Sequence, residues 1–449
     1  MTTEIATTFS ASADMSYMDR LLSEAMSGAT PTAPWLQQLR DNAAALVREL
    51  GMPTTRDENW RFTNISPMSK VQFQQAPARE LPPAAIENIQ LLPKVDCQLV
   101  FVNGIYSPTL SAVEGLPENV FIGNLGQLPA ELSDRLPEYL GNQEGSKEVF
   151  TALNTAGLND AAVVWLGKNA VLETPIHLLF VSIAAETPVL TQPRTLVVAE
   201  PGSACTAIEE YMVADREWCE SSSQPYFTNA VTEIYLGQNA EVKHTRIQRD
   251  AVNGFHIGKS AIAQARDSRY HCIEINTGGQ ISRHNLEIYQ KGEGTQSTLD
   301  GLTVVTDQQL ADTHSNVVLD HPHGTVNQLH KCIIDDRAHT VFNGRVFVPK
   351  PAQQTDASQL NRNLLLSGKG RVDTKPQLEI TADDVKCTHG ATVSQLEPDE
   401  MFYLQSRGLD PVTSRNLLID GFAGEILEKL PLPSLAKRLS RCLACRSDL

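Results

Sequence analysis

The chain has 449 residues, 41% of them hydrophobic and 20% charged, with a formal net charge of −16. This composition can bury a large core, which excludes disorder throughout, and the acidic balance excludes a partner bound through nucleic-acid phosphates. No apolar run is long enough to span a membrane, and the beginning of the chain has the pattern of neither a secretory signal nor a transit peptide. Eight scattered cysteines are typical of a reduced compartment, so we expect a cytoplasmic protein.

Residues 1–155 are predicted to form an N-terminal region that mixes helices with irregular segments. From Pro34 to Leu50 apolar residues recur at helical spacing, and Gly51 follows where a C-terminal cap is expected. Prolines then interrupt residues 77–93, which predicts an irregular connector. Leu99–Val102 is apolar and precedes an Asn-Gly pair, which indicates a short strand that ends in a turn.

Residues 156–392 are predicted to form an all-β core. Short β-rich runs alternate with turn residues, and few helical patterns are long enough to matter. Gly167, Gly202 and Gly237 open successive strands at a spacing of 35 residues. Glycine-led turns that feed short strands without intervening helices favour a solenoid of stacked coils. A β-sandwich is the alternative, because the later turns lose this spacing.

Residues 393–449 are predicted to be helical. A short helix covers Asp399–Arg407, and Asp410 with Pro411 provides the cap and first turn of a second helix that continues to about Lys429.

An apolar stripe follows one face of this second helix. Leu418, Phe422 and Ile426 repeat every four residues, so this face must pack on another surface. That surface is either the rest of the chain, namely the preceding helix and the end of the solenoid, or a partner protein. The pattern leaves both open.

Several clusters of metal-binding residue types have unpersuasive spacing. Histidines 314, 321, 323 and 330 match none of the zinc templates, and the Pro-His-Gly at 322–324 is typical of a turn. Cys442 and Cys445 have the spacing of a redox pair, but no βαβ pattern precedes them, so we interpret them as incidental. The sequence also lacks a ferredoxin pattern and a nucleotide phosphate loop, so we expect no tightly bound cofactor in this chain alone.

Cys387 and His389 are the strongest candidates for chemistry. They lie two residues apart in a predicted strand, so their side chains point the same way, and thiolate and imidazole both suit iron. Two ligands cannot saturate an ion, so the pair is a half-site that other groups must complete. Lys386 and His389 would lower the pKa of Cys387, while Asp383 and Asp384 would raise it. The alternative is that both side chains simply fill the end of the core.

Three segments resemble one known family: Asn361–Leu366, Asp383–Thr392 and, less specifically, Asp57–Asn64. They are similar to SufD, a subunit family of the Suf iron–sulfur assembly machine. The resemblance implies a mainly β fold, with a right-handed parallel β-helix core flanked by N-terminal and C-terminal helical regions. SufB-like chains carry Glu-His-Glu around His389 and a cysteine at the position of Asn361, so the chain resembles SufD rather than SufB.

The resemblance also implies a function. The chain would be a non-catalytic scaffold that pairs with a SufB-like subunit through open strand edges and binds a SufC-like ATPase through residues 399–430. His389 and Cys387 would face the SufB-like subunit as ligands for a transient iron ion or iron–sulfur cluster. The residues predicted to contact the ATPase are Met401, Phe402, Arg407, Leu418, Phe422 and Ile426. The isolated chain could also pair with itself as a homodimer.

The rival prediction is a β-helix enzyme, a lyase or hydrolase that cleaves acidic polysaccharides. The cytoplasmic expectation, the low aromatic content of 6% and the segment 383–392 argue against it.

Overall fold

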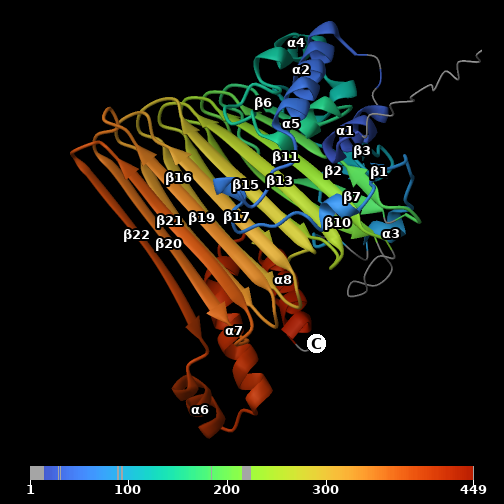
Figure 1. Ribbon diagram of the computed structural model, residues 1–449. Coiled ribbons are helices and arrows are strands. Elements are labelled where there is room, and N and C mark those ends of the chain that lie inside the picture. The colour runs from blue at the N-terminus through green and yellow to red at the C-terminus, as the bar shows by residue number, and fades with distance from the viewer. Residues whose placement is uncertain are drawn as a thin grey trace, which may run out of the picture.

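The computed structural model describes residues 15–28, 30, 32–87, 90–92, 95–183, 185–214 and 224–447, of which 441–447 by their backbone alone. Strands dominate this part of the chain and wind into a solenoid of two facing 11-stranded sheets. Figure 1 shows the coils stacked along one axis, with one group of helices at the N-terminal end and another against the C-terminal coils. The predicted fold, a mainly β solenoid with helices at both ends, is confirmed.

Each sheet takes every second strand of the chain. The first contains β9 (Arg194–Ala199), β11 (Tyr226–Leu236), β13 (Gly254–Gln264), β15 (Ile281–Gln290), β17 (Leu310–Val318), β19 (His339–Val348) and β21 (Arg371–Ile380). The second contains β10 (Ala204–Ala214), β12 (Glu241–Arg249), β14 (Arg269–Asn276), β16 (Gln296–Val305), β18 (Thr325–Ile334), β20 (Thr355–Leu365) and β22 (Val385–Gln395). These strands pair in parallel, so each coil adds one strand to each sheet.

The length of one coil varies along the solenoid. Tyr226 pairs with Gly254, His339 with Arg371 and Ala204 with Glu241, offsets of 28, 32 and 37 residues. The 35-residue glycine spacing therefore marks only the first coils. Those glycine-led turns do stack, because the backbone N–H of Gly202 donates to the carbonyl of Gln238 in the next coil at 2.9 Å.

One left-handed residue per coil shapes this row of turns. The residues with positive φ in the row are Asn169, Gly202, Asn239, Asp267, Gly294, His323 and Gln354. Each is Gly or a residue that can hold the conformation for a single position. Backbone hydrogen bonds link neighbouring turns, for example from the N–H of Asp267 to the carbonyl of Glu293 at 2.9 Å. Asparagine, glycine, aspartate, histidine and glutamine all occur in the row, so a search for glycine does not reveal the repeat.

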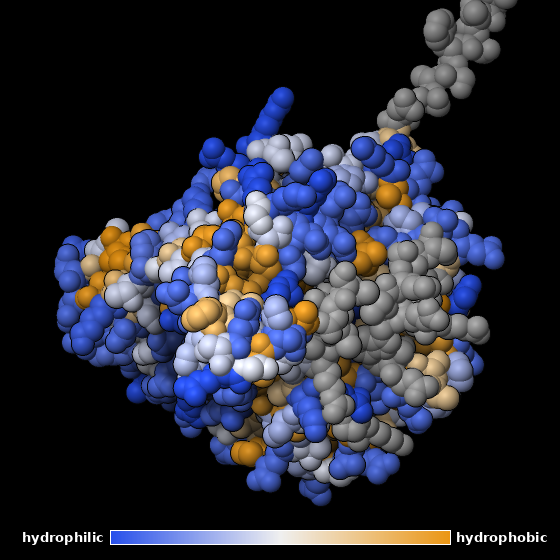
Figure 2. Space-filling view, turned by 90° about the horizontal axis from the view of Figure 1, so that it is seen from below, coloured by the Kyte–Doolittle hydropathy of each residue, from blue (hydrophilic) through white to orange (hydrophobic). Residues whose placement is uncertain are grey.

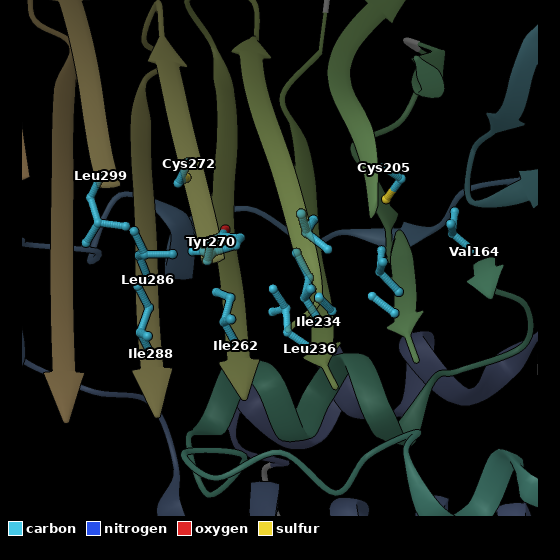
Figure 3. Packing of buried hydrophobic residues seen from close by; sticks show 14 of the residues in the cluster. Val164, Cys205, Ile234, Leu236, Ile262, Tyr270, Cys272, Leu286, Ile288 and Leu299 are labelled. Carbon is cyan, nitrogen blue, oxygen red and sulfur yellow. The ribbon is translucent and has the colours of Figure 1, made fainter. Parts of the chain in front are cut away.

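Apolar side chains fill most of the space between the sheets. Figure 3 shows Ile262, Leu286 and Ile288 of the first sheet close to Tyr270 and Leu299 of the second. Burial of such side chains removes apolar surface from water, at about 25 cal/mol per Å², and is the main force that holds the coils together.

A line of polar and charged groups also runs inside this core. The His244 ring lies 3.0 Å from the carboxylate of Glu209 and 2.9 Å from the hydroxyl of Tyr270, and His284 lies 2.9 Å from Glu274. Burial disfavours the charged form of these carboxylates and by itself would raise their pKa. The charge and hydrogen bonds of the neighbouring histidines have the larger effect and hold the pKa of Glu209 and of Glu274 at about 2. Burial lowers the pKa of His284 to about 4. Near neutral pH the carboxylates are therefore charged and His284 is neutral.

The N-terminal region packs on the first coils. Its helices are α1 (Tyr17–Ser27), α2 (Pro34–Leu50), α3 (Pro83–Glu87), α4 (Ala130–Arg135) and α5 (Val149–Ala156), with 3-10 turns at Glu58–Trp60, Met68–Lys70, Leu125–Gln127 and Leu136–Glu138. Its strands and those of the first coils are β1 (Gln74–Gln75), β2 (Cys97–Val102), β3 (Ile105–Tyr106), β4 (Ala112–Val113), β5 (Val120–Asn124), β6 (Ala162–Leu166), β7 (Ile176–Ile183) and β8 (Val189–Thr191). α2 lies where it was predicted. α1 was not predicted, and α3 lies inside the predicted irregular connector.

The segment 57–64, called the strap below, crosses the outer face of the first sheet. Trp60 is buried beneath the guanidinium of Arg283, which lies 4.0 Å from the ring centroid. The hydroxyl of Thr63 donates to the carboxylate of Asp312 at 2.5 Å. The strap therefore anchors the N-terminal region to the middle coils of the solenoid.

Three helices follow the last strand: α6 (Pro398–Ser406), α7 (Pro411–Leu427) and α8 (Pro433–Ser447). α6 and α7 match the two predicted helices. α8 was not predicted; it includes positions 442 and 445, whose cysteine side chains lie outside the described residues. None of the helices in the described part of the chain combines the length and hydropathy of a membrane span.

Candidate functional site

The last coil of the solenoid ends in two strands that are paired on one side only. β21 pairs with β19 and β22 with β20, and each stands last in the strand order of its sheet. The described residues add no further strand to either edge. β22 is 11 residues long and mostly exposed. Backbone N–H and C=O groups at this open end, formed by β21 and β22, can therefore pair with a strand from another chain.

β22 carries Cys387 and His389 on its inward-facing side. Their partners on β20, Ala357 and Gln359, are both buried, which sets the direction of this face. Cys387 is half-buried against the main hydrophobic core, whereas His389 is exposed. The structure therefore brings the two predicted residues to the open end, and only Cys387 partly fills the core.

The local environment favours the thiol form of Cys387. Burial raises its pKa above the usual value, Asp356 adds to the rise, and the backbone N–H of Ala357 opposes it. The expectation that Lys386 and His389 lower this pKa is therefore wrong. Because side chains alternate along a strand, Lys386 lies on the opposite face of β22 from the sulfur. A thiolate at this position needs positive charge from a metal ion or from a second chain.

The other histidines do not meet at this site. His314 lies on the outer face of β17, His330 is buried between the sheets, and His323 is the left-handed residue of its turn. Across the described ranges, no three His, Cys, Asp or Glu side chains converge into a metal site. An ion held by Cys387 and His389 would therefore need ligands from another chain.

α6 and the first half of α7, together called the helical arm below, extend from the body of the protein in Figure 1. α6 has no buried residue, and Phe402 is 72% exposed. The other exposed large hydrophobic residues of the arm are Tyr403, Val412 and Leu417. Figure 2 views the molecule from below and shows hydrophobic residues gathered into patches among hydrophilic ones. Exposed apolar patches of this kind are typical of interaction surfaces.

The second half of α7 packs on the outer face of the second sheet. Its buried residues Ile419, Ala423, Ile426 and Leu427 share a cluster with Ile275, Leu302 and Ile333 of the strands. The ammonium of Lys331 donates to the carbonyl of Phe422 at 2.9 Å, and Lys429 pairs with Asp300 at 2.7 Å. Of the predicted stripe, Phe422 and Ile426 thus pack on the chain's own solenoid, whereas Leu418 lies outside this cluster.

The residues predicted to contact an ATPase differ in their exposure, because only some of them lie on the arm. Phe402 and Arg407 are exposed, Met401, Leu418 and Phe422 are half-buried, and Ile426 is fully buried. Tyr403, Val412 and Leu417 are more exposed than most of them and were not predicted. Their exposure depends on how α6 leaves the body, which helical periodicity does not determine.

A groove of about 370 Å³ lies on the outer face of the first sheet beside the strap. Polar residues line it, among them Glu58, Glu287, Asn316, Asn343, Arg345 and Glu379. Three of its carboxylates pair with bases: Glu379 with Arg345 at 2.6 Å, Glu287 with Lys259 at 2.7 Å and Glu58 with Lys375 at 2.9 Å. Glycoside hydrolysis needs one carboxylic acid and one carboxylate free to act on the substrate. The paired carboxylates are therefore not free for such a reaction, whereas Glu148, which also lines the groove, accepts hydrogen bonds from the backbone of Phe150 and Thr151.

Two protein-family models match the chain. The SufBD core domain of SUF-system FeS cluster assembly matches residues 180–422, and the SufBD N-terminal region matches residues 12–178. The first match covers the solenoid, the open end and the helical arm. The second covers the N-terminal helices and the strap.

Individual proteins are similar over nearly the whole length. An iron–sulfur cluster assembly SufBD family protein of Synechocystis is 49% identical over 409 residues, 91% of this chain and 90% of the relative. The chloroplastic Protein ABCI7 of Arabidopsis thaliana is 34% identical over 417 residues, 91% and 86% of the two chains. The iron–sulfur cluster assembly protein SufD of Escherichia coli is 31% identical over 399 residues, 88% of each. The chain therefore belongs to the SufBD family of Suf-system iron–sulfur cluster assembly proteins, which confirms its resemblance to SufD.

Proposed function

We propose that this chain is a non-catalytic scaffold subunit of a Suf complex, which pairs with a SufB-like subunit at its open end. The single observation that carries the proposal is the position of His389, exposed on an edge strand whose outer hydrogen-bonding groups have no strand partner among the described residues. A strand from a second chain would extend the sheet and bring its own ligands next to Cys387 and His389. A cytoplasmic location is part of this proposal.

The cargo of the site would be iron or a nascent iron–sulfur cluster. A neutral imidazole suits borderline iron, and a thiolate suits iron and iron–sulfur clusters. Cys387 and His389 offer one of each, and the rise in the pKa of Cys387 favours the thiol in the isolated chain. The complete set of ligands would therefore exist only when the two subunits are paired, because the partner supplies the missing charge and the missing ligands.

A SufC-like ATPase would dock on the helical arm. Phe402, Tyr403 and Leu417 provide exposed apolar anchors, and the buried Lys331 and half-buried Phe422 connect the base of the arm to the second sheet. If ATP in the partner moves the arm, this connection would therefore transmit the movement to the coils next to the open end.

The proposal is tested by coexpression of the chain with SufB-like and SufC-like subunits of the same organism. We expect a stoichiometric complex on gel filtration. His389→Ala should keep this complex and strongly reduce, without abolishing, iron–sulfur maturation in cells. Phe402→Asp should lose the ATPase subunit and keep the SufB-like one. Val252→Asp is the control, because Val252 is exposed on a turn far from the arm in sequence. A chain that stays alone, or full maturation with His389→Ala, would contradict the proposal.

A further inference from the structure

A column of polar side chains inside the solenoid leads to His389. Gln328 of β18 pairs in register with Gln359 of β20, and Gln359 pairs with His389 of β22. Neighbouring strands lie about 4.8 Å apart, and residues in register on one face stack above one another. Gln359 is therefore the side chain directly behind the imidazole.

The hydrogen bonds of this column stop one step before His389. The amide of Gln328 donates to the hydroxyl of Ser315 at 2.9 Å, and Nε2 of Gln359 donates to Oε1 of Gln328 at 2.8 Å. Gln359 is only 3% exposed. Its own Oε1 is buried and has no hydrogen-bond partner among the residues that the structure describes. A buried acceptor without a donor is rare in native proteins and calls for an explanation.

The opposite sheet makes room for this amide. A Cβ atom built on Gly344 of β19 would lie 2.1 Å from Nε2 and 3.0 Å from Oε1 of Gln359. Gly344 does not have a positive φ, so its backbone would accept alanine. The glycine is therefore explained by the space that Gln359 needs.

We propose that Gln359 is a positioning residue for His389: its Oε1 accepts one ring N–H of the imidazole and leaves the lone pair of the other nitrogen facing the open end. Metal-binding histidines commonly donate their second N–H to an oxygen in this way, which fixes the tautomer and the ring orientation. Among the described residues of the isolated chain this acceptor has no donor, so the bond forms when a partner covers the open end and removes competing water. The inference rests on the proposed function, because Gln359 acts only through His389.

Maturation assays in cells with the full complex separate this role from a structural one. Gln359→Met keeps the length of the side chain and removes the acceptor, so maturation should fall at least about tenfold, as losses of such supporting contacts do. In the background of His389→Ala, Gln359→Met should cause no further loss. If Gln359→Met lowers the residual activity of the His389→Ala variant by the same factor as it lowers the activity of the native chain, the proposal is overturned.

Gly344→Ala tests the same contact from the other sheet. The new methyl group should displace the amide of Gln359 and reproduce the loss caused by Gln359→Met. Gly368→Ala is the matched control, because a Cβ atom at that position would have no neighbouring atom within 4 Å. Gel filtration of each complex shows whether the subunits still assemble. Normal maturation with Gly344→Ala in an intact complex would contradict the proposal.

The nitrogen spectrum of the histidine ring gives a readout that does not depend on maturation. The full chain is labelled with ring ¹⁵N histidine in complex with its unlabelled partners, and His389→Gln identifies the signal. We expect one tautomer in the native chain and a mixture in Gln359→Met. The same mixture in both would overturn the proposal. If His389→Ala leaves maturation intact, the proposed function fails, and this spectrum alone decides the role of Gln359.

Discussion

Single buried side chains determine how this solenoid responds to acid. Burial lowers the pKa of His284 to about 4, from an ordinary value of 6.5, and Arg246 adds to the shift while Glu274 opposes it. Between these pH values the unfolded chain binds more protons than the folded one. We therefore predict that the free energy of unfolding falls as the pH falls from 6.5 toward 4, by up to about 3 kcal/mol for this group. Urea unfolding at a series of pH values measures this loss.

The variant His284→Gln separates this effect from that of the carboxylates. It should weaken the pH dependence above pH 4.5 without abolishing it, because glutamine takes up no proton but burial also lowers the pKa of His256 and of His330. Glu209, whose pKa is held at about 2, loses its contribution only as the pH falls from 4.5 through 2. The variant removes the largest effect that lowers the pKa of Glu274, so this carboxylate should lose its contribution at a higher pH than in the native chain. Stability that stays constant from pH 6.5 down to 4.5 in the native chain would contradict the prediction.

The sequence predicts some residues of the site and hides others. Cys387 and His389 were predictable, because a two-residue spacing in a strand places them on one face and the surrounding segment resembles a known family. Gln359 was not, because its importance depends on the register that stacks it between Gln328 and His389. Coils of 28 to 37 residues do not give that register from a single sequence. The rise in the pKa of Cys387 depends on burial, which the sequence shows only indirectly.

The stacked turns are the elements that most limit substitution. A Cβ atom on Gly237 would lie 2.7 Å from the backbone nitrogen of Pro201 in the neighbouring turn. Gly237→Ala should therefore destabilise the protein by about 1 to 3 kcal/mol, since a backbone atom cannot move aside cheaply. Gly368→Ala is the control, because nothing lies within 4 Å of its Cβ, and it should change stability by less than about 0.5 kcal/mol. Equal urea midpoints for the two variants would refute this explanation.

The strap is the element that joins the N-terminal region to the middle coils. Trp60→Ala should lower the free energy of unfolding by about 3 to 5 kcal/mol, because it leaves a cavity and removes the aromatic ring from Arg283. Arg61→Ala, at the exposed neighbouring position, should have little effect. Thermal unfolding of the two variants compares them. A small effect of Trp60→Ala would contradict the prediction and show that the contacts between the strap and the sheet contribute little to stability.

Helices and turns were predicted unevenly for physical reasons. α2, α6 and α7 were found because their caps and apolar spacing are local signals. α1 was missed although it has the same local signals: Ser16 caps it, and its buried residues Met18, Leu21, Leu22 and Ala25 recur at helical spacing. The later turns of the solenoid use Asp267, His323 and Gln354 in the left-handed conformation, so no constant residue marks the repeat.

At the scale of the whole molecule, the two ends of the solenoid differ. The N-terminal helices cover the first coils, whereas the last coil leaves β21 and β22 without a further strand among the described residues. Repeat proteins need a cap at each end, because each coil buries its apolar face against the next one. A second protein chain at the open end would provide the missing cap. The open end of the folded chain is thus a surface that favours pairing.

Charge placed on the inward face of the open end should therefore prevent pairing without unfolding the chain. Val393 lies on this face, because its partner Asn363 is buried, yet Val393 itself is 52% exposed. In the free chain Val393→Lys should change stability by less than about 1 kcal/mol, since the ammonium can stay in water. A covered seam would bury this charge without a partner, so the variant should no longer elute with the SufB-like subunit. Thr388→Lys adds the same charge to the outer face of the same strand and should still pair. Equal pairing of both variants would show that the partner binds elsewhere.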